Sequence, residues 1–205
     1  MENEKYIKIT ISFVIMLFIE AWIMSGFPIG NTIFSIINYL VTSFFAACLL
    51  FMEKSSDNHT KQGFIGIYAM GLIMSLGGFQ SPVKMLLNIE SNLWLLVLAG
   101  WLITFILGLA YAFKESKIGK ILYINPFQNR DGLLFELLPL IFTMVIAAIV
   151  VPIFISYRLN SLDALTSLQR SILIYYGFLP YCFSILIIAL FPCFLFGVYK
   201  SINTR

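Results

Sequence analysis

The sequence predicts an all-α integral membrane protein with six transmembrane helices and with both the N- and C-termini in the cytoplasm. The 205-residue chain is 60% hydrophobic and only 11% charged, whereas soluble domains carry about 25% charged residues. Because so little charge cannot coat a globule of this size, the bilayer must act as part of the solvent. No hydrophilic block is long enough for a second domain, so residues 1–205 are expected to form a single polytopic membrane domain.

The individual helices are predicted from apolar runs of about 20 residues, the length that crosses a bilayer. Polar or turn-forming stretches separate six such runs, and the third is short and rich in glycine. The predicted spans cover residues 7–26, 31–52, 63–79, 92–113, 132–156 and 169–199.

The sixth run is too long for one span. A helix from 169 to 199 would be about 46 Å long at the usual rise, against a hydrocarbon core of about 30 Å. Pro180 and Pro192 would also interrupt it. We therefore expect a short interfacial helix near residues 161–176, capped by Ser161, followed by the span itself.

The distribution of lysine and arginine orients these helices, because cytoplasmic connections hold an excess of cations. With six spans, ten of the 13 cations fall on one side of the membrane. They are Lys5, Lys8, Lys54, Lys61, Lys114, Lys117, Lys120, Arg130, Lys200 and Arg205. Only Lys84, Arg158 and Arg170 fall on the other. An odd number of spans would scramble this bias, so we expect a multi-pass protein of the cell membrane, specifically a bacterial plasma membrane.

Glu20 is the most informative residue of the first span, because residues 9–27 are otherwise built mainly from large apolar side chains. A carboxylate at membrane depth costs roughly 2.5–3.5 kcal/mol on insertion scales, so it is rarely kept without a partner or a task.

The second span carries a polar stripe. Asn31, Ser35, Asn38 and Thr42 follow at intervals that place them on one helical face. Asn31 can cap the helix, and the hydroxyls can bond their own backbone, but Asn38 has neither role. It either joins helices or lines a polar path. Both interpretations stay open, and the candidate path consists of Glu20, Asn38, Ser35 and Thr42.

The turn around residues 27–30 predicts that the first two spans pack as an antiparallel hairpin. Reflecting position 20 through this turn gives a position near 37. Glu20 and Asn38 should then lie at similar depth, each roughly 10 Å inside the outer boundary. We expect a hydrogen bond between them.

The fourth span carries a ridge of small residues at four-residue intervals. Its members are Gly100, Thr104, Gly108 and Ala112. Such ridges let another helix approach closely within lipid. The ridge therefore predicts helix packing, with a partner helix in this chain or in another subunit.

Enzymatic functions find no support in the sequence. The single histidine, His59, lies in a polar connection, which leaves no histidine for a serine protease triad or for haem ligation by a pair. Neither an HExxH motif, nor a cluster of His and Cys ligands, nor a GxxxxGK[ST] loop is present. We expect no enzyme, no cofactor, no bound metal and no nucleic-acid partner. The lipid bilayer is the expected environment.

The six-helix plan with both ends inside resembles the topology of the membrane subunit of an export-type ABC transporter. It also resembles in outline the small membrane proteins that make bacteria immune to secreted peptides. We expect a permease or transporter subunit whose polar path follows the first two helices, completed by a separate ATPase, another membrane subunit or further copies of the chain. The alternative is a non-transporting interaction protein, such as a peptide-immunity protein or an accessory subunit.

Overall fold

Six continuous helical rods form the protein in a computed structural model that describes residues 2–51, 56–87, 89, 92–113, 130–161 and 165–203. The first four rods are α1 (Glu2–Gly26), α2 (Thr32–Phe51), α3 (Ser56–Leu87) and α4 (Trp94–Phe113). The fifth consists of α6 (Arg130–Val145), the π-helical η1 (Ile146–Val150) and α7 (Val151–Ser161). The sixth consists of α8 (Ser167–Ile172), the π-helical η2 (Leu173–Phe178) and α9 (Leu179–Asn203). The all-helical prediction is confirmed.

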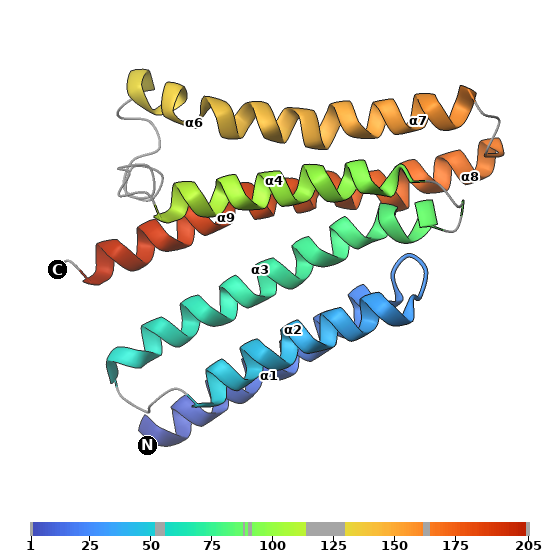
Figure 1. The fold of residues 1–205 in the computed structure, drawn as a ribbon. Coiled ribbons are helices and arrows are strands. Elements are labelled where there is room, and N and C mark those ends of the chain that lie inside the picture. Colours follow the sequence, from blue (N-terminus) through green and yellow to red (C-terminus); the bar gives the residue numbers. More distant parts are fainter. Residues whose placement is uncertain are drawn as a thin grey trace.

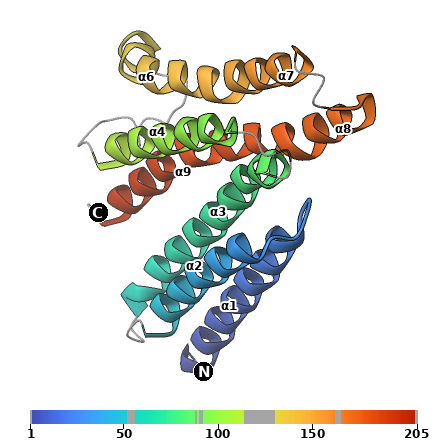
Figure 2. The ribbon, with the colours of Figure 1, turned by 45° about the vertical axis from the view of Figure 1, so that its right-hand side comes forward.

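The rods run alternately up and down, so that both chain ends lie at the same end of the bundle (Figure 1). We call the opposite end, where residues 27–31 join α1 to α2, the hairpin end. The helix α3 lies between the α1–α2 hairpin and the α4–α9 pair in both views (Figures 1 and 2). It packs on α1 and α2 on one side and on α9 on the other.

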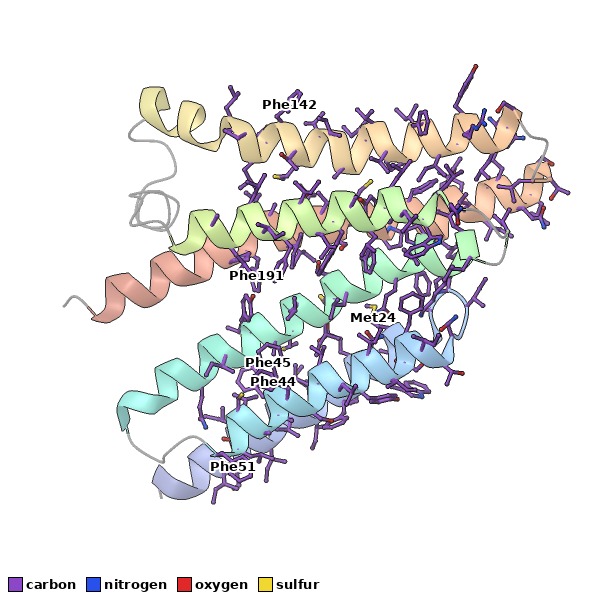
Figure 3. All side chains as sticks on the ribbon, in the orientation of Figure 1. Met24, Phe44, Phe45, Phe51, Phe142 and Phe191 are labelled. Atoms are coloured by element: carbon purple, nitrogen blue, oxygen red, sulfur yellow. The ribbon has the colours of Figure 1, made fainter. Side chains whose placement is uncertain are left out.

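Among the described residues, four segments are long and apolar enough to cross a membrane. They are Ile7–Gly26, Thr32–Phe51, Leu138–Ser161 and Ser167–Pro192. Large apolar side chains project from the outer faces of these helices (Figure 3), and the exposed fraction reaches 69% for Trp22, 87% for Phe51 and 65% for Phe142. The main apolar core lies inside, between α3, α4 and the fifth and sixth rods, and a smaller one lies between α1, α2 and α3.

The third helix is longer than the sequence predicted. It was expected over residues 63–79 and instead contains 32 residues, which gives a length of about 48 Å. Polar residues and Pro82 predict a connection after residue 79. The helix continues there because Gln80, Ser81 and Lys84 are buried, each with a hydrogen-bond partner.

The expected separate helix near residues 161–176 is not formed. Ser161 ends α7 and does not cap a helix. Thr166 caps α8 instead, through a capping box with Gln169. From Ser167 the helix continues without a break to Asn203.

A π-helical turn explains how this last helix passes Pro180. Proline lacks an N–H group, and its ring clashes with the carbonyl four residues earlier. In the structure η2 ends two residues before Pro180, and η1 ends two residues before Pro152. A π turn is wider than an α turn, and it lets the backbone pass the proline without ending the helix.

Candidate functional site

Polar side chains are buried along the whole contact between α1, α2 and α3, and we call this set the polar column. Its members are Thr10, Glu20, Ser25, Asn38, Thr42, Gln62, Gln80 and Lys84. Each of the three helices contributes to it. Buried polar groups normally need hydrogen-bond partners, so the partners at each level indicate what the column does.

At the hairpin end, the column is closed by amide hydrogen bonds. Gln80 Nε2 donates to Asn38 Oδ1 at 2.7 Å, and Asn38 Nδ2 donates to Gln80 Oε1 at 3.0 Å. Asn38 Nδ2 also lies 3.4 Å from Ser25 Oγ. One side chain from each of the three helices takes part, so this layer joins all three.

Lys84 completes the hairpin end with a buried positive charge. Its ammonium group donates to the carbonyl oxygens of Met24, Ser25 and Phe27, each at 3.1 Å, and lies over the ring of Phe34. Met24 and Ser25 lie in the last turn of α1 and Phe27 directly follows it, where free acceptors and the helix dipole favour a cation. All three ammonium protons are therefore committed.

In the middle of the column, Glu20 is buried with an exposed fraction of 8%. Neither of its carboxyl oxygens has a hydrogen-bond partner. The expected bond to Asn38 is not formed. Helical side chains lean toward the N-terminus of their own helix, so in an antiparallel pair at equal depth they lean apart. Asn38 leans toward Ser25 at the hairpin end, whereas Glu20 leans the other way.

Thr42 lies one turn beyond Asn38 in α2, away from the hairpin end. The contact between Ser25 and Asn38 fixes the register of α1 against α2, and one turn away from the hairpin end leads to Ala21 on α1 and to Thr42 on α2. Thr42 is fully buried, and its hydroxyl oxygen also has no partner.

The surroundings of this middle level are apolar. Leu17 and Ala21, on either side of Glu20 in the helix, are fully buried in the smaller apolar core together with Ile73 of α3. Just toward the hairpin end, Met24 lies between α1 and α3 (Figure 3), where Gly77 leaves room for it. The part of the column between the amide layer and Gln62 thus holds three unpartnered oxygens, two of Glu20 and one of Thr42.

Gln62 and Thr10 make the level nearest the chain ends. Gln62 Nε2 donates to Thr10 Oγ1 at 3.2 Å and to the Leu49 carbonyl at 3.3 Å. Its side-chain oxygen has no partner. This level is thus bonded across α1, α2 and α3 but keeps one free acceptor, unlike the closed layer at the hairpin end.

The remaining residues of the predicted stripe serve their own helix. Asn31 Oδ1 accepts from the backbone N–H groups of Ile33 and Phe34, and Ser35 Oγ donates to the Asn31 carbonyl at 2.9 Å. The structure therefore brings Glu20, Asn38 and Thr42 to one buried contact but uses the Ser35 hydroxyl locally.

The small-residue ridge of α4 packs against α9 of the same chain. A Cβ atom added to Gly108 would lie 2.7 Å from the Ile188 carbonyl oxygen, and one added to Gly100 would lie 2.7 Å from the Tyr181 hydroxyl. Thr104 Oγ1 donates to the Gly100 carbonyl at 2.7 Å. The side chain of Ala112, the fourth member, lies outside the described side chains.

A second polar cluster joins α3, α4 and α9. Trp101 Nε1 lies 2.9 Å from Ser184 Oγ and 3.1 Å from Ser75 Oγ, and Ser184 Oγ donates to the Ser75 carbonyl. Every polar atom of this cluster is used, so it holds helices together. Within the described residues, no group of three or more His, Cys, Asp or Glu side chains could hold a metal ion.

Sequence reasoning missed four members of the polar column: Thr10, Ser25, Gln62 and Lys84. It assigned Gln80 to a connection as well. One signal in the sequence was available: Gln62 and Gln80 flank the apolar part of the third span. In a longer third helix both side chains can face α1 and α2.

Comparisons with known protein families, with curated proteins and with solved structures find no match for this chain. The fold defines an all-helical protein with apolar helices compatible with a membrane.

Proposed function

We propose that this chain is a membrane transport protein, a permease or transporter subunit with a polar path through α1, α2 and α3. The observation that carries the proposal is Glu20, buried with neither carboxyl oxygen bonded. At membrane depth such a group costs roughly 2.5–3.5 kcal/mol and commonly marks an ion or substrate pathway. No hydrogen bond to a neighbouring helix explains the burial of Glu20, which supports a role in binding a cation, a proton or a polar substrate group.

The order of the layers supports this proposal. Transporters keep their binding groups near the middle of the bilayer, with access controlled from either side. Glu20 and Thr42 lie between the closed amide layer of Asn38 and Gln80 and the level of Gln62, which retains a free acceptor. In the proposed mechanism the amide layer opens and closes the hairpin end.

The proposed topology has all six helices in a bacterial plasma membrane, with both termini in the cytoplasm. The excess of lysine and arginine at the chain ends and in the second and fourth connections supports it. The common position of the two chain ends agrees with an even number of crossings (Figure 1). Because the chain is small, we expect a separate ATPase, another membrane subunit or a second copy to complete the pathway.

A second candidate, a non-transporting interaction or immunity protein, is favoured by one observation. Asn38 and Gln80 bond each other reciprocally, as residues that merely hold helices together would do. In this alternative Glu20 serves stability alone.

Flux across reconstituted membranes separates the two candidates. Purified protein in liposomes is exposed to concentration jumps of protons, Na⁺, K⁺ and small amino acids, and currents and uptake are recorded. We expect flux that depends on the protein and that Glu20→Gln reduces to the level of empty liposomes, because the variant lacks a group that can bind a cation or proton. Glu90→Gln, which removes a carboxylate from the connection between α3 and α4, is the control and keeps the flux.

The thermal stability of each variant in detergent is measured in parallel. A Glu20→Gln protein with full flux contradicts the transport path. A protein that conducts none of the tested solutes, and whose only response to Glu20→Gln is a changed melting temperature, supports the interaction protein.

A further inference from the structure

We infer that the ligand of Glu20 is a proton, which its carboxyl group exchanges with the side of the chain ends, where Gln62 keeps a free acceptor. The role of this proton in transport rests on the proposed function, whereas proton binding itself follows from the surroundings of Glu20. A proton needs one oxygen lone pair, which forms an O–H bond on uptake and recovers the electron pair on release.

The number of available oxygens argues against a metal cation. Hard cations such as Ca²⁺ and Mg²⁺ take six or more oxygen ligands. Around the middle level only the Glu20 carboxyl and the Thr42 hydroxyl have unpartnered oxygens among the described side chains. The buried neighbours Leu17, Ala21 and Ile73 are apolar and supply no further side-chain oxygen.

Among the described side chains, no cation is bonded to Glu20. Helix α1 packs against α2 and α3, and the described titratable side chains on these two helices are Tyr39, Cys48, Tyr68 and Lys84. Tyr39 is exposed, and Tyr68 packs edge-on against an aromatic ring. Lys84 donates its three ammonium hydrogen bonds to carbonyl groups at the end of α1.

On α1 itself, the described cation Lys8 lies three turns from Glu20 and is exposed. An ionised carboxylate left alone in such a site is costly, and such groups bind a proton instead.

Thr42 and Gln62 are the candidate hydrogen-bonding groups for the proton and for the water that delivers it. A hydroxyl donates one hydrogen bond and accepts others, so Thr42 can serve both the protonated and the ionised carboxyl group. Toward the chain ends, the free Gln62 oxygen can accept a hydrogen bond from an entering water. Toward the hairpin end, every amide group of Asn38 and Gln80 has a partner, so release in that direction requires this layer to open.

Infrared spectroscopy of the full chain in lipid bilayers tests the protonation directly. We expect a carbonyl stretch of a protonated carboxylic acid, which disappears reversibly as the pH is raised. Glu20→Gln should remove this band, while Thr42→Val, which leaves the carboxyl group in place, should retain it. A spectrum with no such band at any pH, and with only a carboxylate band lost in Glu20→Gln, would overturn the inference.

A second measurement uses the unmodified protein and does not depend on the folding of a variant. Dicyclohexylcarbodiimide enters apolar regions and reacts with protonated carboxyl groups. We expect an adduct on Glu20 by peptide mass spectrometry, with labelling lost as the pH rises; absence of labelling throughout the pH range contradicts proton binding. An ionised Glu20 together with Glu20-dependent flux of Na⁺ or K⁺ would contradict proton binding but support transport. A protonated Glu20 without any flux would support proton binding but contradict transport.

Discussion

Asn38 and Gln80 hold α2 and α3 together through two amide hydrogen bonds, and neither residue can make them alone. Replacing one amide by leucine leaves the other buried without its partner, which costs about 1–3 kcal/mol. Replacing both removes that penalty. We therefore expect Asn38→Leu and Gln80→Leu each to destabilise the protein, and the double variant to lose about 1 kcal/mol less than the sum of the two.

Unfolding of the four proteins in detergent, followed by circular dichroism, gives this coupling energy. Ser171→Ala is the control, because the Ser171 hydroxyl is exposed and bonds only its own helix. Strict additivity of Asn38→Leu and Gln80→Leu would mean that the two amides do not depend on each other.

At the scale of single residues, burial could be predicted from the sequence more accurately than hydrogen-bond partners. Glu20, Asn38 and Thr42 are all buried, as expected for polar residues in apolar runs. The predicted bond between Glu20 and Asn38 is not formed, because side chains on antiparallel helices lean in opposite directions along the axis. The true partner of Asn38, Gln80, is 42 residues away, and nothing local in the sequence joins them.

The contact between α4 and α9 depends on the absence of a side chain at Gly108. A methyl group there would lie 2.7 Å from a backbone carbonyl of α9, so the helices would have to move apart. We expect Gly108→Ala to destabilise the protein by about 1–3 kcal/mol, the usual range for overpacking.

Gly63→Ala provides the matched control for this prediction. Gly63 lies in α3 with open space around its Cα, and alanine favours a helix over glycine by up to about 1 kcal/mol. Thermal melts in detergent should therefore show a lower melting temperature for Gly108→Ala and an equal or higher one for Gly63→Ala. Equal effects at the two positions would mean that the close approach to α9 is not required.

Helix ends were harder to predict than helix centres. Apolar runs in the sequence correctly indicate the centres of the helices, because long apolar segments must be removed from water. The extension of α3 through Pro82 and Lys84 depends on partners in α1 and α2, and the final helix passes Pro180 after a π turn and Pro192 within α9. Both are decided by tertiary packing, so local rules on proline and polar residues placed the boundaries wrongly.

The whole molecule has two ends, and the proposed topology puts them on opposite sides of a membrane. In a cysteine-free background, single cysteines replace Gly30 and Ser161 at the hairpin end and Lys5 and Asn203 near the chain termini. We expect a membrane-impermeant thiol reagent to label the first two in intact cells and the last two only after permeabilisation. This follows because lysine and arginine concentrate at the chain ends. Labelling of all four in intact cells, or the opposite pattern, contradicts the orientation.

Lys84 also constrains how the protein is made. The first helix ends at residue 26, yet the group that saturates its last carbonyls belongs to the third helix, 59 residues after Ser25 in one of these bonds. While a ribosome is still adding the second helix, the end of the first has open acceptors and no ammonium group to fill them. The leading hairpin therefore reaches its final form only when the third helix arrives beside it, and the order of synthesis becomes an order of assembly.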